Sequence, residues 1–304
     1  MPLRLFAAVL TLFIAGACLP AMASDDEPLV DDTETVDYSR GFLFDFGESL
    51  IDPTYRGVGP SFVFPDDVKN YHTYGIDLSH HNFANGRTFP WSKMHESGIR
   101  FVYLKASQGK KFIDKTLVAN WTKVGEASTP ERQILRGAYH FLSADVDPTE
   151  QAKHFVKLMK NLGFDRQNDL PPCLDVEWDL GTTKSGKKVD RWLKYSPDDI
   201  NEKVNSWISH VETELNVKVV LYTSASWWDS VNLSNNSNLT NRPIWIADYS
   251  NKSFRNSSPR KIPGVPFVIW QMTDNSRLGS TKDFDGNVAM MAWDDFISSM
   301  RPVK

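Results

Sequence analysis

Cysteine is scarce in the 304-residue sequence, which holds only Cys18 and Cys173. We expect Cys18 to leave with an amino-terminal signal segment, so the mature chain keeps one thiol and can form no intrachain disulfide. Long apolar runs are also missing after that segment, because none reaches the ~18 residues that span a bilayer. The sequence therefore predicts a chain without a transmembrane segment, whose stability comes from a large core.

Positive charge and metal-ligand spacings are scarce as well. Lys and Arg number 34 against 38 Asp and Glu, which gives a net charge of −4. Nucleic acid is therefore an unexpected partner. His80 and His81 are adjacent, and neighbours on an extended chain point apart, while no His-x-His or His-x-x-x-His spacing occurs. We expect no metal, no cofactor and a monomer.

The amino-terminal segment has the pattern of a secretory signal. Arg4 is followed by an apolar run over residues 5–19 and then by Ala21-Met22-Ala23, so cleavage is expected before Ser24. The protein is expected to be secreted or periplasmic. In an alternative interpretation, residues 15–18 (AGAC) resemble a lipobox and leave the chain lipid-anchored at Cys18. Removal of residues 1–23 takes away Arg4 and no acid, which changes the net charge to −5.

The remaining chain divides at about residue 71. Residues 24–71 are acidic and then rich in Gly, Pro and Asp, without a sustained period of 2 or 3.6, which is typical of a tether that ends against the next domain. Residues 72–304 alternate short β-like runs with helical ones, which predicts one α/β domain. Eight such runs suggest a closed barrel. They cover residues 74–79, 101–107, 136–142, 173–177, 219–223, 243–249, 267–273 and, more weakly, 284–290.

Helices are predicted mainly between the early strands. Residues 147–150 (DPTE) form a capping box with a first-turn proline, and apolar residues follow at helical spacing to Leu162. Residues 196–199 (SPDD) open a second helix, which extends to Leu215. Residues 232–241 are expected to be loop, and residues 250–266 are too polar and proline-rich for a long helix. The barrel should therefore be covered by helices early and linked by loops late.

Two carboxylates mark the fourth run, which lies within the stretch LPPCLDVEW at residues 170–178. Pro171 and Pro172 exclude a helix, so residues 173–177 are predicted to be a strand that points Asp175 and Glu177 to the same face. Two residues along a strand place the Cα atoms about 6.6 Å apart, so ionisation of one carboxyl group should raise the pKa of the other. One of them could then remain a proton donor at neutral pH. In the alternative interpretation, both acids are solvated and only cap the end of a strand. The apolar residues beside them disfavour this alternative.

Other polar side chains fall at the carboxyl ends of the predicted strands, where barrels of parallel strands carry their chemistry. His140 is expected to be a hydrogen-bonded barrel residue rather than a base. Trp245 and Trp270 fit the core as well as a sugar-binding surface. The full candidate set is Asp77, Gln108, Tyr139, Asp175, Glu177, Tyr222, Asp248, Trp270 and Gln271.

Five ordered blocks carry a resemblance to a known family. They are YGIDLSHHN at 74–82, LKASQG at 104–109, GAYHF at 137–141, LDVE at 174–177 and WQ at 270–271. In order and spacing they resemble glycoside hydrolase family 25, the Chalaropsis-type lysozymes, over about residues 74–296. The resemblance implies a TIM-like (β/α)5(β)3 barrel of eight mostly parallel strands, and an N-acetylmuramidase that acts on the glycan strands of peptidoglycan. Residues 72–304 would be its catalytic barrel.

The resemblance also implies roles for particular residues. Glu177 would be the general acid/base and Asp175 its partner, with Asp77 and Asp248 in an acidic floor. The other candidates would bind substrate. One block departs from the family, whose second-strand motif usually ends Thr-Glu-Gly, whereas here it is Ser107-Gln108-Gly109. An amide at position 108 cannot share protons, which puts the charge balance and pH optimum in question.

Several alternatives stay open at this point. Asp175 could attack the sugar directly, or it could stabilise the substrate's own 2-acetamido group as nucleophile, which we favour. A chitinase-like amidosugar hydrolase also combines a barrel with an Asp-x-Glu motif, but its longer run of acids before that motif is missing. A cell-wall-binding module without catalysis would account for Gln108.

Overall fold

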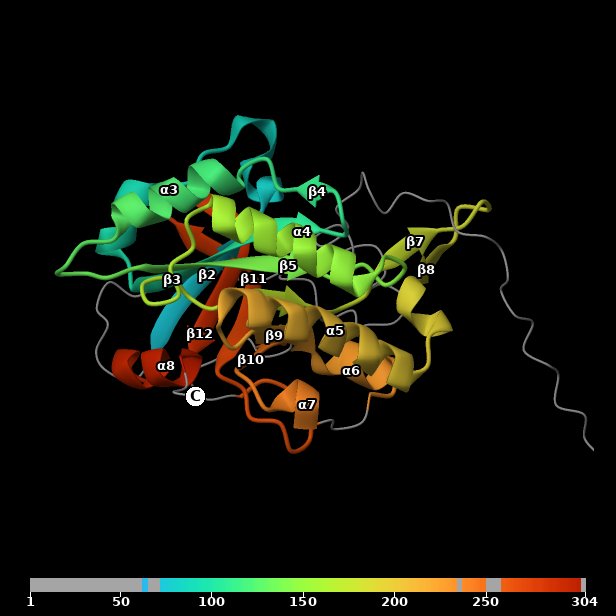
Figure 1. Cartoon of the computed structure of the whole chain (residues 1–304). Helices are drawn as coiled ribbons and strands as arrows, with labels where there is room; N and C mark the ends of the chain where they lie inside the picture. Colours follow the sequence, from blue (N-terminus) through green and yellow to red (C-terminus); the bar gives the residue numbers. More distant parts are fainter. Residues whose placement is uncertain (1–61, 65–71, 234–236, 250–257, 302–304) are drawn as a thin grey trace, which may run out of the picture.

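The structure is a computed structural model that describes residues 62–64, 72–233, 237–249 and 258–301. The expected signal segment 1–23, the alternative anchor Cys18 and nearly all of the extension 24–71 lie outside the described residues. Eight of the described strands close into a barrel (Figure 1). In barrel order they are β2 Thr73–Leu78, β3 Ile99–Gln108, β5 Leu135–Phe141, β6 Cys173–Asp175, β9 Val220–Ser224, β10 Ile244–Ala247, β11 Ile269–Leu278 and β12 Thr281–Ala289.

The pairing of the strands confirms the predicted TIM-like (β/α)5(β)3 fold. The neighbours from β2 to β11 pair in parallel, whereas β12 is antiparallel to both β11 and β2 and closes the barrel between them. All eight predicted runs correspond to strands, with shifted ends. The fourth is shorter than predicted, because β6 ends at Asp175 and Glu177 lies in a bend.

Helices cover the early strands, as predicted. They are α3 Leu117–Ala127, α4 Pro148–Asn161 and α5 Pro197–Leu215, followed by the short α6 Ala225–Ser230, α7 Ser237–Thr240 and, after the last strand, α8 Trp293–Met300. Helix α5 has the full capping box between Ser196 and Asp199, but α4 has only half of one. There Asp147 accepts from the backbone N–H of Glu150, whose own carboxylate binds Lys153 at 2.7 Å. Helix α7 corrects the loop predicted over residues 232–241.

Two apolar layers follow from the alternation of side chains along the strands. Outward residues such as Leu174 pack under the helices, and inward residues such as Cys173 fill the barrel. Two glycines make room for inward aromatic rings. A Cβ atom on Gly75 would lie 2.2 Å from the Phe101 ring, and one on Gly137 would lie 2.5 Å from the Tyr103 ring. Large and small residues on neighbouring strands therefore fill the interior together.

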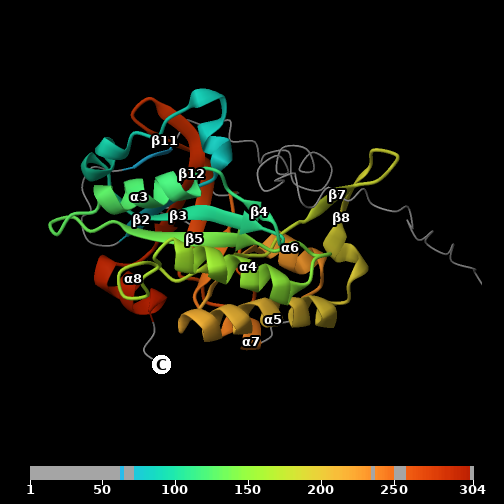
Figure 2. The same cartoon turned by 45° about the horizontal axis from the view of Figure 1, so that its top comes forward.

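Different elements lie at the two ends of the barrel. Helix α8 places Phe296 against Phe101 of the interior, with ring centroids 5.0 Å apart, and so covers the end where the parallel strands begin. The hairpin of β7 Leu180–Thr182 and β8 Lys188–Asp190 projects from the opposite end, and both views show this separation (Figures 1 and 2). In the part of the chain that the structure describes, no helix is long and apolar enough to cross a membrane.

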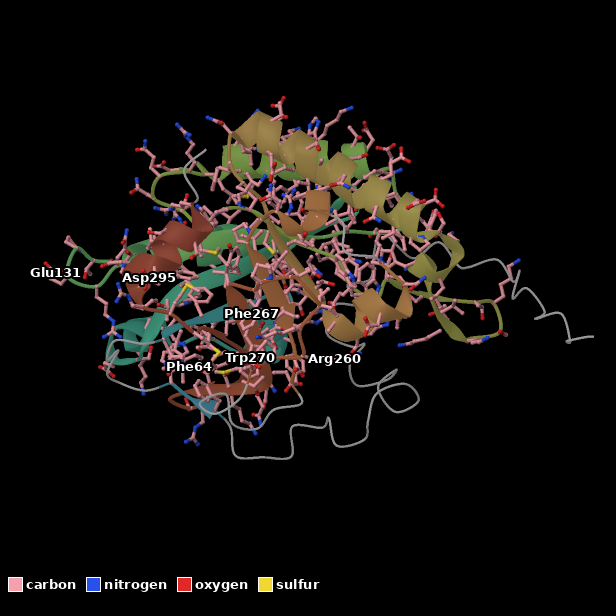
Figure 3. All side chains as sticks on the ribbon, turned by 90° about the horizontal axis from the view of Figure 1, so that it is seen from below. Phe64, Glu131, Arg260, Phe267, Trp270 and Asp295 are labelled. Carbon is pink, nitrogen blue, oxygen red and sulfur yellow. The ribbon has the colours of Figure 1, made fainter. Side chains whose placement is uncertain are left out.

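A short stretch before the barrel contacts it. Strand β1, Phe62–Val63, pairs in parallel with the far part of β11. The next residue, Phe64, is 3% exposed, and its ring stacks on Phe284 and meets Tyr74 edge-on (Figure 3). Phe64 therefore belongs to the core of the domain, although it precedes the boundary predicted at residue 72.

Candidate active site

The two carboxylates of the Asp-x-Glu motif lie at the carboxyl end of the barrel. Asp175 is the last residue of β6, and the backbone N–H of Val176 still donates to the carbonyl of Tyr222 at 3.0 Å, so the chain follows β9 for one more residue. The backbone then bends at Glu177. Asp175 and Glu177 are both buried, with 4% and 9% of their surface exposed. These acids are therefore not the solvated caps of an exposed strand end.

The surroundings of Glu177 favour its protonated form. Its pKa is raised well above the usual value, first by burial and then by the charge of Asp175, while Lys105 acts in the opposite direction. Asp285 and Asp77 add smaller upward contributions. The predicted effect of Asp175 on the pKa of Glu177 is present, but removal of Glu177 from water is the larger cause. A carboxyl group with a raised pKa keeps its proton to higher pH and can donate it to a leaving group.

Asp77 is the centre of a hydrogen-bond network across the barrel. Its Oδ2 accepts from Gln271 Nε2 at 2.9 Å and from Asn287 Nδ2 at 2.8 Å. The Gln271 Oε1 atom in turn accepts from the hydroxyls of Tyr222 at 2.8 Å and Tyr249 at 2.5 Å. Burial raises the pKa of both tyrosines well above the usual value, so both hydroxyls remain donors. The network joins three predicted site residues and fixes the orientation of the Asp77 carboxylate.

Gln108 faces the same space because of an irregularity in β3. The pairing of β3 with β5 shifts register between Lys105 and Ser107, which lets Ser107 turn outward to His140 at 2.8 Å. Gln108 then faces inward with Lys105, whose Nζ donates to its Oε1 at 3.1 Å. Both side chains are buried. Tyr139 lies beside Lys105 in the register and is 8% exposed.

Asp248 and Trp270 form one unit on neighbouring strands. Asp248 follows β10, and its carboxylate accepts from the backbone N–H of Arg260. The indole N–H of Trp270 donates to the Asp248 carbonyl at 2.8 Å. Trp270 and Trp245 are 0% and 2% exposed, so their burial fits the core rather than a sugar-binding surface. The structure places Trp270 behind Asp248, where it supports the backbone.

The histidines have structural surroundings. His140 is fully buried, bonded to Gln151 at 3.1 Å and stacked on Trp207, and burial lowers its pKa to about 3. It is therefore a neutral barrel residue, as predicted. His80 and His81 begin a 3-10 helix, His80–Gly86, and their rings lie 4.1 Å apart, which corrects the prediction that they point apart. Among the described residues, no group of three or more His, Cys, Asp or Glu could hold a metal ion.

Four polar residues of the site were missed by the sequence analysis. Asp285 pairs with Asp77 in the register, and Asn287 pairs with Gln271. Because β12 runs antiparallel, its first half lies at the end of the barrel where the other strands finish. A search for polar residues at the carboxyl ends of the predicted strands therefore overlooks Asp285 and Asn287. The alternating Asp285 and Asn287 in residues 284–288 (FDGNV) were the available signal. The other two residues are Lys105 and Tyr249.

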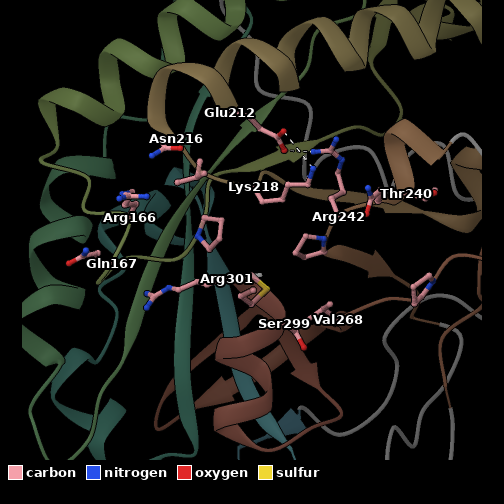
Figure 4. A pocket seen from close by; sticks show the side chains of 16 residues that line it. Arg166, Gln167, Glu212, Asn216, Lys218, Thr240, Arg242, Val268, Ser299 and Arg301 are labelled. Atoms are coloured by element: carbon pink, nitrogen blue, oxygen red, sulfur yellow. Dashed lines mark hydrogen bonds and ion pairs between the residues drawn. The ribbon is translucent and has the colours of Figure 1, made fainter. Parts of the chain in front are cut away.

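A separate cavity opens at the opposite end of the barrel. Among its lining residues, Pro171 and Pro243 precede β6 and β10, and Met300 ends α8. Glu212 lines its wall and pairs with Arg242 at 2.6 Å and with Lys218 at 3.8 Å (Figure 4). None of the predicted site residues lines this cavity.

Comparison with known proteins adds independent support for the fold. A bacterial lysozyme from Streptomyces coelicolor has a similar structure, with a TM-score of 0.62, 27% identity and coverage of 77% of this chain and 98% of that chain. A family 25 glycosyl hydrolase from Bacillus anthracis has a TM-score of 0.59 at 23% identity, over 80% of this chain and all of that one.

Sequence relatives point the same way. Lysozyme M1 of Streptomyces globisporus is 30% identical over 245 residues, which cover 76% of this chain and 72% of the relative. N,O-diacetylmuramidase of Arthroderma benhamiae is 27% identical over 202 residues, which cover 64% of this chain and 76% of the relative. The profile of the family described as glycosyl hydrolases family 25 matches residues 76–281. Since that match spans well over half of the sequence, the chain belongs to glycosyl hydrolases family 25.

Proposed function

We propose that this chain is an exported muramidase that hydrolyses the β-1,4 bond between N-acetylmuramic acid and N-acetylglucosamine in peptidoglycan. The observation that carries the proposal is the environment of Glu177. This carboxyl group is buried at the carboxyl end of the barrel, and both its burial and the charge of Asp175 raise its pKa. The printed names of the relatives, a lysozyme and an N,O-diacetylmuramidase, agree with this substrate class.

In the proposed reaction Glu177 donates its proton to the glycosidic oxygen as the bond breaks. Positive charge then builds at the anomeric carbon, and a carboxylate beside that carbon stabilises it. Asp175, two residues from Glu177 in the sequence and also buried, supplies this negatively charged carboxylate. After the leaving sugar departs, the ionised Glu177 accepts a proton from the attacking water. Asp77, Gln271 and Tyr222, already fixed to one another, bind the sugar ring together with Gln108, Tyr139 and Asp248.

Asp175 is proposed to orient the substrate's 2-acetamido group as the internal nucleophile rather than to attack the sugar itself. Glycans with free amines in place of the N-acetyl groups separate the two routes. Substrate assistance predicts a large loss of kcat on the deacetylated glycan. A direct carboxylate nucleophile predicts a change mainly in KM.

Purified mature protein incubated with peptidoglycan and with chitin tests the substrate. Muramidase activity predicts new reducing ends on N-acetylmuramic acid from peptidoglycan and little release from chitin. Glu177→Gln should fold and lose about 10²-fold or more in turnover, because general acid catalysis contributes about 10² to 10⁴. The matched control is Glu214→Gln on the exposed face of α5. Preferred release from chitin, or normal peptidoglycan turnover by Glu177→Gln, contradicts the proposal.

The remaining parts of the proposal concern export, the division of the chain and the oligomeric state. Residues 1–23 direct export to the periplasm or exterior, residues 24–71 form the extension, and residues 72–304 form the catalytic barrel, acting as a monomer. Mass spectrometry of the exported protein tests the first point. Ser24 as the new amino terminus is expected, whereas a lipidated Cys18 at the amino terminus would establish the anchored form instead.

A further inference from the structure

Glu177 lies between two fixed points of the backbone. On its amino side, the N–H of Val176 is bonded to β9. On its carboxyl side, Asp179 is fully buried immediately before β7. Its backbone N–H donates to Asp190 Oδ1 at 3.0 Å, and its carbonyl accepts from the backbone N–H of Arg191 at 2.8 Å. The bend that holds Glu177 is therefore tied to the barrel at one end and to the β7–β8 hairpin at the other.

The Asp179 side chain joins three segments. Its Oδ1 accepts from Arg191 Nη1 at 3.0 Å, and both side chains are 1% exposed. The same Nη1 atom donates to the carbonyl of Leu180 at 2.7 Å. The other carboxylate oxygen, Oδ2, accepts from the backbone N–H of Ala144 at 2.7 Å, in the segment that follows β5. The ends of β5 and β6 and the hairpin thus meet at one carboxylate.

This junction continues into the barrel wall. Next to Ala144, the backbone N–H of Ser143 donates to Gln151 Oε1 at 2.9 Å, and that oxygen lies 3.1 Å from His140 Nε2. Each of these side chains is buried. Among the described strands, β7 and β8 pair only with each other and form a separate two-stranded sheet. The ion pair therefore joins the base of the hairpin to the residues that follow Glu177, together with the two backbone hydrogen bonds of Asp179.

We propose that the Asp179–Arg191 ion pair is a positioning device that holds the Glu177 carboxyl at the bond to be cleaved. The inference rests on the proposed function, and neither residue touches the reacting atoms. A displacement of about 1 Å in a catalytic group can lower the rate about 10²-fold. Loss of the pair should therefore lower kcat and leave substrate affinity, which the Asp77 network provides, nearly unchanged.

The chain offers a matched control at the other end of the barrel. Asp169 Oδ1 accepts from Arg136 Nε at 2.8 Å, and the Asp169 side chain is 4% exposed. Arg136 lies near the start of β5, far along the strand from its catalytic end. Asp169→Asn therefore removes a buried carboxylate of the same kind without altering the segment around Glu177.

The experiment compares Asp179→Asn with Asp169→Asn on soluble glycan fragments of peptidoglycan. The double variants Asp179→Asn/Arg191→Met and Asp169→Asn/Arg136→Met accompany them, because removal of both charges avoids an unpaired buried charge that could unfold the chain. We expect kcat to fall about 10- to 100-fold in both Asp179 variants, with KM within about twofold. The Asp169 variants should keep kcat per folded molecule, whatever their melting temperature.

The outcomes separate the two proposals. Equal kcat in the Asp179 and Asp169 variants, or a rise of KM alone, would show that the ion pair only stabilises the hairpin. If wild type and Asp169→Asn both fail to cleave any peptidoglycan glycan, the proposed function falls, and positioning falls with it. If wild type cleaves and the Asp179 variants match it, positioning alone is wrong.

Discussion

Gln108→Glu tests how charge controls the catalytic acid. Gln108 Oε1 already accepts from the Lys105 ammonium at 3.1 Å, so a carboxylate in its place would form a buried ion pair and ionise. In the present chain Lys105 lowers the pKa of Glu177, against the effects of burial and Asp175. A new anion beside Lys105 would cancel that effect. The pKa of Glu177 should therefore rise.

The size of this change follows from Coulomb's law. A unit charge about 10 Å away, at an effective dielectric constant of about 20, contributes about 1.7 kcal/mol, which is about one pKa unit. Glu177 must be protonated to act, so the alkaline limb of the pH profile reports its ionisation in the free enzyme. We expect Gln108→Glu to move that limb upward by about one pH unit.

The assay is kcat/KM against pH on soluble glycan fragments, for wild type, Gln108→Glu and Gln108→Met. The methionine variant removes the oxygen that Lys105 contacts without adding a charge, so its alkaline limb should not move upward. An unchanged or lowered limb in Gln108→Glu would refute electrostatic coupling between position 108 and Glu177. Gln108 would then be left with a role in binding or packing.

Glu177→Gln should be more stable than wild type at neutral pH. In wild type the pKa of Glu177 is higher in the folded than in the unfolded chain, where it is about 4.3. Above that pH, each pKa unit of difference lowers the free energy of unfolding by about 1.4 kcal/mol, and the amide removes this cost. Denaturant unfolding at about pH 7 and pH 3 should show the gain only at the higher pH, and a gain at both would contradict the linkage. Deletion of residues 24–61 should leave stability and activity unchanged, whereas deletion of residues 24–67 also removes the buried Phe64 and should cost about 3–5 kcal/mol while activity per folded molecule persists. Loss of that activity would place part of the site in the extension. His140, with its pKa lowered to about 3, should stay neutral by NMR between about pH 5 and 8. A titration midpoint in that range would show that the ring is not enclosed.

The sequence determined the order and class of the elements, because local patterns carry that information. Short β-like runs between helical segments predicted all eight barrel strands, and Ser196 with Asp199 predicted the start of α5. The Asp-x-Glu motif also pointed to Asp175 and Glu177, because both acids lie at the end of a predicted strand with apolar neighbours. Glu177 itself lies in a bend rather than in the strand, because its backbone turns away to reach the hairpin.

Tertiary structure alone decided which residues meet. The direction of β12 is not readable from residues 281–289, yet it brings Asp285 and Asn287 beside Asp77. The irregular register of β3 turns Gln108 toward Lys105. Burial of Glu177, the largest cause of its raised pKa, depends on side chains from several strands and is a property of the closed barrel. Local sequence specifies each strand's pattern, but pairing direction, register and removal from water arise only when distant segments pack together.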